Sequence, residues 1–352
     1  MNALPFLGKS NRIPYKFYFW VVFILMLSMV TYVFPEELDI IRYYENATLA
    51  LRNFPSIFDY ATNLFETQID FIYSSSLYLA GKNGIHMNVV TIFYMSLYYI
   101  AIFEVLRKHF PNIKISGAIL FYVTMFAPFI WVQSIARNLA AIAFFYIFIS
   151  CLLDGKNIKA VFWLIVSMFT HISMLMYLPV ILVSFLLKRL ELNNKFINLS
   201  IVAALILSYI VPSQLLNFIS IVMEGDETRY GAVYGALETQ GALMSSSIGY
   251  GDKVPIVFCL VYSVLLLFLR KSKDFMYWML YVLSLMLSFF ILSSLMFTNR
   301  VIMLMTLFVA YNAYKVVCEG KSDSKKKLYL ASLIGCVVVF LHFYSYRTHF
   351  SL

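Results

Sequence analysis

An arginine flanked by neutral hydrogen-bond donors is the first group in the sequence suited to binding a phosphate. Arg137 separates two apolar runs and lies within four residues of Gln133, Ser134 and Asn138. A guanidinium binds phosphate oxygens through paired hydrogen bonds and stays charged when partly removed from water. The amides and the hydroxyl could add neutral donors, so this stretch predicts a phosphate contact. The alternative is an arginine that extends to lipid headgroups at the membrane surface.

A second arginine, Arg300, follows Asn299 and begins another apolar run. A cation at a helix N-terminus opposes the helix dipole, whereas an anion is favoured there. The Asn-Arg pair therefore predicts an anion near this helix end, and Arg137 and Arg300 together could hold a pyrophosphate. The alternative is an arginine that only marks the end of a membrane span.

One histidine, His171, lies inside a long apolar stretch, in the segment Phe-Thr-His-Ile-Ser that ends at Ser173. Such a histidine could act as a general base or donate a hydrogen bond to a phosphate. The alternative is a buried histidine whose partners are purely structural. The sequence has no cysteine cluster and no HExxH motif, so it predicts no metal site.

A polar segment with paired tyrosines follows the first apolar run. Asp39 and Arg42 have the i, i+3 spacing of one helix face. Asp39 could be a catalytic carboxylate and Arg42 an anion contact, while Tyr43 and Tyr44 could stack on sugars. The alternative is a solvated loop. Arg229, in a later acidic segment, is a weaker candidate of the same kind.

The elements that must position these groups are membrane-spanning helices. Hydrophobic residues make up 62% of the 352-residue chain and charged residues 13%, against about half and a quarter in soluble domains. The net charge of +9 is explained by the positive-inside rule and not by nucleic acid. Apolar runs of spanning length occupy Phe17–Phe34, Met87–Leu106, Ile115–Val132, Ile135–Leu153, Phe196–Pro212, Val254–Leu269, Phe275–Met296, Val301–Val317 and Leu328–Tyr346.

Two further stretches are interpreted from their flanking charges. Residues 160–187 have basic residues at both ends, so we expect a hairpin of two short helices with His171 at its turn. If Asp70–Ala80 does not span, nineteen Lys and Arg residues lie inside and eight outside, as the positive-inside rule requires. The prediction is therefore an all-α polytopic protein of about eleven spans, with a re-entrant or interfacial segment near 65–81.

This topology predicts one transmembrane domain over 1–352, with a cytoplasmic N-terminus and an outward C-terminus. The two long outer loops are then 35–86 and 213–253. Long loops commonly carry binding or catalytic groups, so we expect function at the outer face.

The order of these motifs resembles the EpsG family of Wzy-type polysaccharide polymerases, which join lipid-linked repeat units of O-antigen, capsule or exopolysaccharide in the bacterial inner membrane. The resemblance rests on the acidic-tyrosine stretch 39–44, Ser-x-x-Arg at 134–137, Phe-x-His-x-Ser at 169–173 and Asn-Arg at 299–300. It extends over most of the chain.

The resemblance implies a GT-C-like, metal-independent membrane glycosyltransferase without a cofactor. Its substrates would be glycans linked to undecaprenyl pyrophosphate, and membrane lipids and a chain-length regulator would be its other partners. Arg137 and Arg300, aided by Gln133, Asn138 and Asn299, would bind the pyrophosphate. His171 or Asp39 would take the hydroxyl proton, and Arg42, Tyr43, Tyr44, Ser173 and Arg229 would contact the sugars.

Three other functions share some of these features. A flippase of lipid-linked oligosaccharide should carry charge reachable from both faces, which the spans lack. An O-antigen ligase uses related donors but often has one large outer domain. A membrane O-acyltransferase needs its histidine on the side of the acyl donor, whereas His171 is expected outside.

Overall fold

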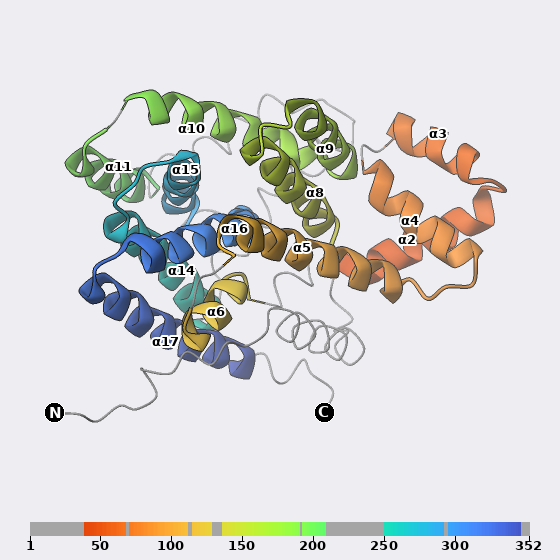
Figure 1. The fold of residues 1–352 in the computed structure, drawn as a ribbon. Helices are drawn as coiled ribbons and strands as arrows, with labels where there is room; N and C mark the ends of the chain where they lie inside the picture. The colour runs from red at the N-terminus through yellow and green to blue at the C-terminus, as the bar shows by residue number, and fades with distance from the viewer. Residues whose placement is uncertain are drawn as a thin grey trace. The chain divides into compact units, whose positions relative to one another are not determined.

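The computed structural model describes residues 39–67, 70–111, 115–128, 136–190, 192–208, 250–291 and 295–345. Every regular element within these residues is helical (Figure 1). The chain divides into two compact units, the first comprising 1–120, 127–178 and 343–352 and the second 121–126 and 179–342. We describe each unit by itself. The single bundle over 1–352 stays a prediction.

Four helical segments among the described residues are long and apolar enough to cross a membrane. They are Asn88–His109, Ser173–Leu190, Thr298–Glu319 and Ser322–Ser345. Five shorter apolar helices accompany them, Arg137–Leu153, Asn157–Thr170, Asn194–Leu207, Lys253–Leu269 and Phe275–Phe290. This is the pattern of a helical membrane protein. The predicted number of eleven spans is untested, and the first predicted span, 17–34, lies outside the described residues.

A group of three helices begins the first unit. Helix α4 (Phe71–Lys82) packs against α2 (Asp39–Asn53) and α3 (Ile57–Thr67). The ring of Tyr60 stacks on that of Tyr78 at 5.0 Å, and Lys82 Nζ donates to the carbonyl of Pro55 at 2.8 Å. At 12 residues, α4 is about 18 Å long, well short of a hydrocarbon core of about 30 Å. Its length agrees with the segment predicted not to span near 65–81.

Helix α8 (Ala136–Leu153) packs against both α5 (Asn88–His109) and α9 (Asn157–Thr170). Ala140, Ala141 and Ala143 of α8 are fully buried, and such small side chains allow helix backbones to approach closely in membranes. Ser167 Oγ of α9 donates to the carbonyl of Ala141 at 2.7 Å. Helix α8 is therefore held on two sides.

The turn between α8 and α9 carries a charge cluster. Gly155 has φ +72°, and the Lys156 N–H bonds back to the Cys151 carbonyl at 2.9 Å, as in a Schellman ending, where glycine is favoured. Asp154 forms ion pairs with Lys108 and with Lys156. The hydrogen bond from Lys108 is the main cause that holds the pKa of Asp154 below its usual value.

A break at His171, the predicted turn of the hairpin, is confirmed, and the hairpin itself stays a prediction. Helix α9 has 14 residues and ends at Thr170, and His171 itself is extended, with φ −161° and ψ 123°. A 3-10 turn, η2 (Ile172–Tyr177), then leads into the 13-residue α10 (Leu178–Leu190). The depth of this break in a membrane stays a prediction.

The apolar run 115–132, which is predicted to span, is not one continuous helix. Helix α6 covers Gly117–Thr124, only eight residues, and residues 125–127 form bends. Pro128 follows these bends, and the residue before a proline is disfavoured in the helical region. Apolar composition therefore set the burial of this segment but not its helix length.

In the second unit, α15 (Phe275–Phe290) packs against α11 (Asn194–Leu207), α14 (Tyr250–Leu269) and α16 (Leu295–Glu319). Most of α15 and α16 is fully buried. Along α17 (Ser322–Ser345), by contrast, an apolar stripe is exposed, made of Leu330, Ile334, Val337, Phe340, Leu341 and Tyr344. The spacing of three or four residues places these side chains on one face, which suits contact with lipid.

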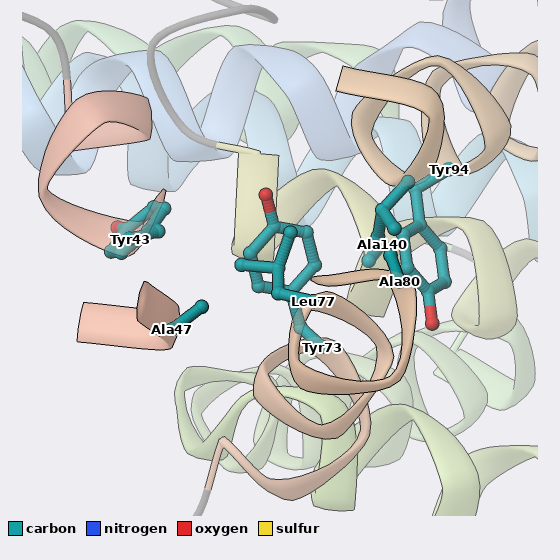
Figure 2. Packing of buried hydrophobic residues seen from close by; sticks show 8 residues of the cluster. Tyr43, Ala47, Tyr73, Leu77, Ala80, Tyr94 and Ala140 are labelled. Carbon is teal, nitrogen blue, oxygen red and sulfur yellow. The ribbon is translucent and has the colours of Figure 1, made fainter. Parts of the chain in front are cut away.

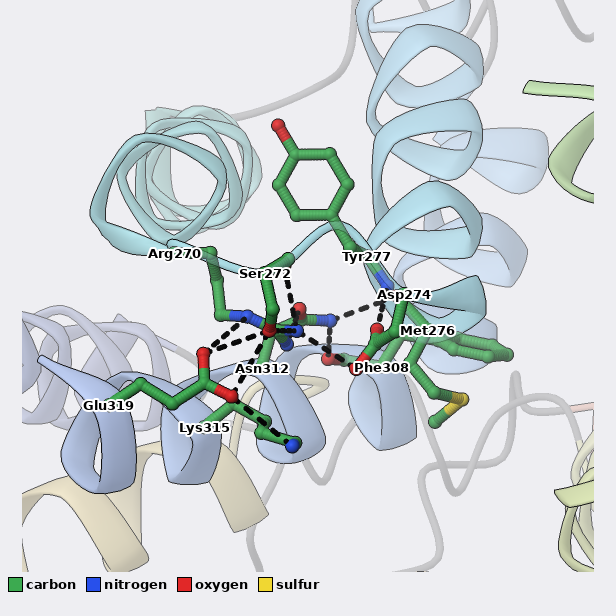
Figure 3. A network of polar contacts seen from close by, with 9 residues as sticks. All are labelled: Arg270, Ser272, Asp274, Met276, Tyr277, Phe308, Asn312, Lys315 and Glu319. Atoms are coloured by element: carbon green, nitrogen blue, oxygen red, sulfur yellow. Dashed lines mark hydrogen bonds and ion pairs between the residues drawn. The ribbon is translucent and has the colours of Figure 1, made fainter. Parts of the chain in front are cut away.

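A buried arginine joins three helices of the second unit (Figure 3). Arg270, just after α14, donates to Asn312 Oδ1 at 2.5 Å and to Asp274 Oδ2 at 2.9 Å. Ser272 accepts from the same guanidinium at 2.9 Å and donates to Glu319 at 2.8 Å. The Arg270 side chain is 0% exposed, so these contacts compensate a charge removed from water. This network stabilises the fold at a predicted cytoplasmic end.

Candidate active site

The site is built around a carboxylate, Asp70, that joins two distant helix ends. Its Oδ2 forms an ion pair with Arg137, and its Oδ1 lies 2.6 Å from His171 Nδ1. Side-chain exposure is 10% for Asp70, 15% for Arg137 and 11% for His171. These residues are 67 and 101 positions from Asp70 in the sequence. The first unit therefore brings a carboxylate, a guanidinium and an imidazole into one largely buried cluster.

Each member stands where a helix begins or breaks. Asp70 immediately precedes α4, with φ −81° and ψ 50°, and Arg137 is the second residue of α8. His171 occupies the extended residue between α9 and η2. An arginine in the first turn of α8 opposes the helix dipole, and the adjacent Asp70 carboxylate compensates this charge.

Two tyrosine side chains, Tyr43 and Tyr73, pack beside the cluster. The guanidinium carbon of Arg137 is 4.3 Å from the ring centroid of Tyr43, a cation–π contact. Tyr43 in turn meets Tyr73 edge to face at 5.8 Å. Figure 2 shows the apolar cluster to which both rings belong, with Leu77 of α4 beside Tyr73 and Ala140 of α8 beside Ala80 and Tyr94. The ring of Tyr43 therefore gives the guanidinium a second contact besides the ion pair with Asp70.

The second predicted tyrosine, Tyr44, lies close by but serves the packing of α2 on α5. Its hydroxyl is 2.9 Å from Thr91 Oγ1, which also lies 3.4 Å from the Tyr73 hydroxyl. Burial raises the pKa of Tyr44 to about 12, so the phenol stays protonated at neutral pH. Thr91 thus links the two helices that carry Tyr44 and Tyr73.

A neutral pair extends the site along α8 and η2. Ser173 Oγ donates to Asn138 Oδ1 at 3.1 Å. The Asn138 side chain is fully buried, and its Nδ2 has no hydrogen-bond acceptor among the described residues. An unsatisfied buried donor costs about 1–3 kcal/mol, which a ligand acceptor would recover. Asn138 follows Arg137 directly in the first turn of α8.

The predicted second arginine belongs to the other unit. Arg300 and Asn299 lie in the first turns of α16, after Thr298, whose hydroxyl donates to the Phe290 carbonyl at 3.1 Å. In the described part of the chain, the buried atoms Arg300 Nε and Asn299 Oδ1 have no hydrogen-bond partner. These two buried atoms could still form hydrogen bonds with a ligand. Its distance from Arg137 is untested, so the joint clamp stays a prediction.

The other predicted site residues lie outside what the structure describes. Asp39 and Arg42 have a described backbone in α2, but their side chains, like Gln133, Ser134 and Arg229, are not described. Within the described ranges, no group of three His, Cys, Asp or Glu side chains could hold a metal ion.

Sequence reasoning missed Asp70. Asp70 was only the first residue of a short apolar stretch, and the predicted catalytic carboxylate was Asp39. The signal in the sequence is its place directly before an apolar helical run, because an acidic residue is favoured at a helix N-terminus. Its partners, however, are distant in the sequence and could not be identified from it.

Comparison with known proteins gives one whole-chain result. The family model EpsG family matches residues 12–351. No curated protein and no solved structure matches the chain. The match includes all the residues of the cluster around Asp70, and a family model that matches over this length establishes membership. The chain therefore belongs to the EpsG family, a family of Wzy-like polymerases.

Proposed function

We propose that this protein polymerises polysaccharide repeat units at the outer face of a bacterial inner membrane. It transfers a growing glycan from undecaprenyl pyrophosphate to the hydroxyl of another lipid-linked repeat unit. The observation that carries the proposal is the cluster of Arg137, His171 and Asp70 beside the unsatisfied Asn138 donor. Such a cluster combines a cation for the leaving group with a proton acceptor.

The reaction makes one bond and breaks one. The acceptor hydroxyl gives its proton to His171, and its oxygen bonds to the anomeric carbon of the growing glycan. The bond from that carbon to the pyrophosphate oxygen breaks, and its electron pair leaves with undecaprenyl pyrophosphate. Arg137 and Asn138 stabilise the negative charge that develops there, without a metal ion, and Arg300 supplies a second cation.

The position of the cluster along α8 supports an outward-facing site. Arg137 is at the start of this helix, and the charge cluster of Asp154 and Lys108 follows its end. Helix α8 has 18 residues and is about 27 Å long, close to the thickness of the hydrocarbon core. Basic loops favour the cytoplasm, so the opposite end of α8 faces outward.

Complementation of a strain that lacks its polymerase tests this function. The wild-type protein should restore a ladder of long chains, whereas Arg137→Ala and Arg300→Ala should leave single repeat units although the protein is expressed. Arg107→Ala is the matched control, since Arg107 pairs with Glu104 on one exposed helix face. It should give a normal ladder.

Other results would assign another function. A flippase predicts that even single repeat units disappear in the deletion strain. A ligase predicts that lipid-linked polymer still forms but is not transferred to its final acceptor. Full ladders from both alanine variants would overturn the arginine roles.

A further inference from the structure

We infer that Asp70 is the positioning residue of the polymerase reaction, orienting His171 so that Nε2 accepts the proton of the attacking hydroxyl. This inference rests on the proposed function and deepens it, because the sequence left open whether His171 or Asp39 is the base. The geometry favours His171, which has a carboxylate partner at 2.6 Å.

The Asp70 contact selects one tautomer of His171. An ionised carboxylate can only accept hydrogen bonds, so the imidazole nitrogen facing it, Nδ1, must carry the proton. Nε2 then holds the lone pair. When Nε2 takes a proton, the imidazolium forms next to the Asp70 carboxylate, which stabilises it as in other histidine bases held by a carboxylate.

Asp70 is placed to hold His171 and not to touch substrate. Each of its oxygens already accepts from a partner, Oδ1 from His171 and Oδ2 from Arg137. Asp70 immediately precedes α4, and α4 packs against α9, which ends at Thr170, directly before His171. Tyr73, three residues after Asp70 and fully buried, fixes this end of α4 against Tyr43.

The Arg137 contact has a second effect. A guanidinium stays charged at all relevant pH values, and it compensates the Asp70 charge in a site with 10% side-chain exposure. One carboxylate therefore links the proton acceptor to the group that binds the leaving pyrophosphate. Loss of Asp70 should act mainly through His171, because Arg137 keeps its cation–π contact with Tyr43.

Asp70→Asn tests the inference with little change in shape. The asparagine amide can donate to Nδ1, which moves the imidazole proton to Nε2 and removes the base. We expect the first-order rate at saturating substrate to fall about 10²–10⁴-fold, in the range found when a positioned base or its orienting carboxylate is lost. Asp154→Asn is the matched control, since Asp154 also bridges two basic residues but lies beyond the far end of α8. It should keep the wild-type rate within about threefold.

The decisive measurement is a double-mutant cycle on the full chain in liposomes. The probe is the single lipid-linked repeat unit extracted from a polymerase-deficient strain, and the readout is the rate of dimer formation. If Asp70 acts through His171, then Asp70→Asn should have no further effect in the His171→Ala background. It should keep its full effect in the Arg137→Lys background.

The outcomes distinguish a failure of the positioning role of Asp70 from a failure of the proposed polymerase function. An effect of Asp70→Asn that persists in His171→Ala, or that disappears in Arg137→Lys, overturns the positioning role. A His171→Ala protein with the wild-type rate overturns the assignment of the base while the polymerase function stands. A wild-type protein that forms no dimer overturns the proposed function itself. If Asp70→Asn yields too little folded protein, Asp70→Glu takes its place, and its retained carboxylate should keep the rate at least tenfold above that of His171→Ala.

Discussion

Replacement of Arg137 by lysine should separate the need for a cation from the need for a planar, fixed guanidinium. The structure gives Arg137 an ion pair with Asp70 and a ring contact with Tyr43 at 4.3 Å. Lysine keeps the charge but has a single point of contact on a flexible stem. It cannot hold both neighbours and also bind two oxygens of a pyrophosphate.

The expected loss follows from these contacts. One charge-assisted hydrogen bond is worth about 1.5–3 kcal/mol, and a cation–π contact about 0.5–2 kcal/mol. Arg137→Lys should therefore raise the barrier by about 2–5 kcal/mol, which is a fall in kcat/KM of about 30-fold to several thousand-fold. Tyr43→Leu removes the ring contacts with Arg137 and with Tyr73, and loss of the first should cost about 2- to 30-fold, while Tyr43→Phe keeps both ring contacts and should stay closer to wild type.

The assay is dimer formation from lipid-linked repeat units in liposomes, with the amount of folded protein measured by gel filtration in detergent. A wild-type value of kcat/KM for Arg137→Lys would refute the requirement for a fixed guanidinium. Equal values for Tyr43→Leu and Tyr43→Phe would refute the ring contact as the feature that fixes it.

Three further predictions concern stability, each measured by thermal unfolding in detergent. Arg270→Ala removes the donor to the buried Asn312 and the partner of the half-buried Asp274 and should destabilise the protein by about 1–3 kcal/mol; an unchanged melting temperature would contradict this. Gly335→Ala should also lower the melting temperature, because a Cβ there would lie 2.3 Å from the Tyr122 ring, whereas Ser324→Ala on the same helix should not. Lys108→Ala should raise the pKa of Asp154 toward its ordinary value of 3.8. Because the pKa of Asp154 is lowered in the folded protein, its pair with Lys108 stabilises the fold above about pH 4. This stabilisation, under about 1 kcal/mol, should fade as the pH falls further. A difference in melting temperature between wild type and Lys108→Ala that widens in acid would contradict this.

Several parts of the fold could be predicted from particular residues. The basic residues on both sides of 160–187 indicated a break near His171, and the break is there, at the extended residue after Thr170. The short stretch after Asp70 was expected not to span, and α4 has only 12 residues. The first prediction relied on the charges that flank one stretch and the second on the distribution of Lys and Arg over all the loops, and both can be counted in the sequence.

Other parts depended on contacts that the sequence does not contain. The stretch 115–132 is apolar enough for a span, yet α6 ends at Thr124. Apolar composition predicts burial but does not set where a helix ends when the segment is packed among others. The contact of Tyr44 with sugars stays a prediction, and the contact of its hydroxyl with Thr91 at 2.9 Å could not be inferred from the sequence.

The sequence by itself determined the class of protein and the kinds of group that carry charge. Long apolar runs have no other stable environment than lipid, and an arginine or a histidine among them is costly enough to mark a functional position. Arg137, His171 and Asn138 were therefore visible from composition and spacing alone. Only the tertiary structure decided which groups meet. Asp70 compensates Arg137 and His171 from 67 and 101 residues away, because the packing of α4, α8 and α9 brings their ends together.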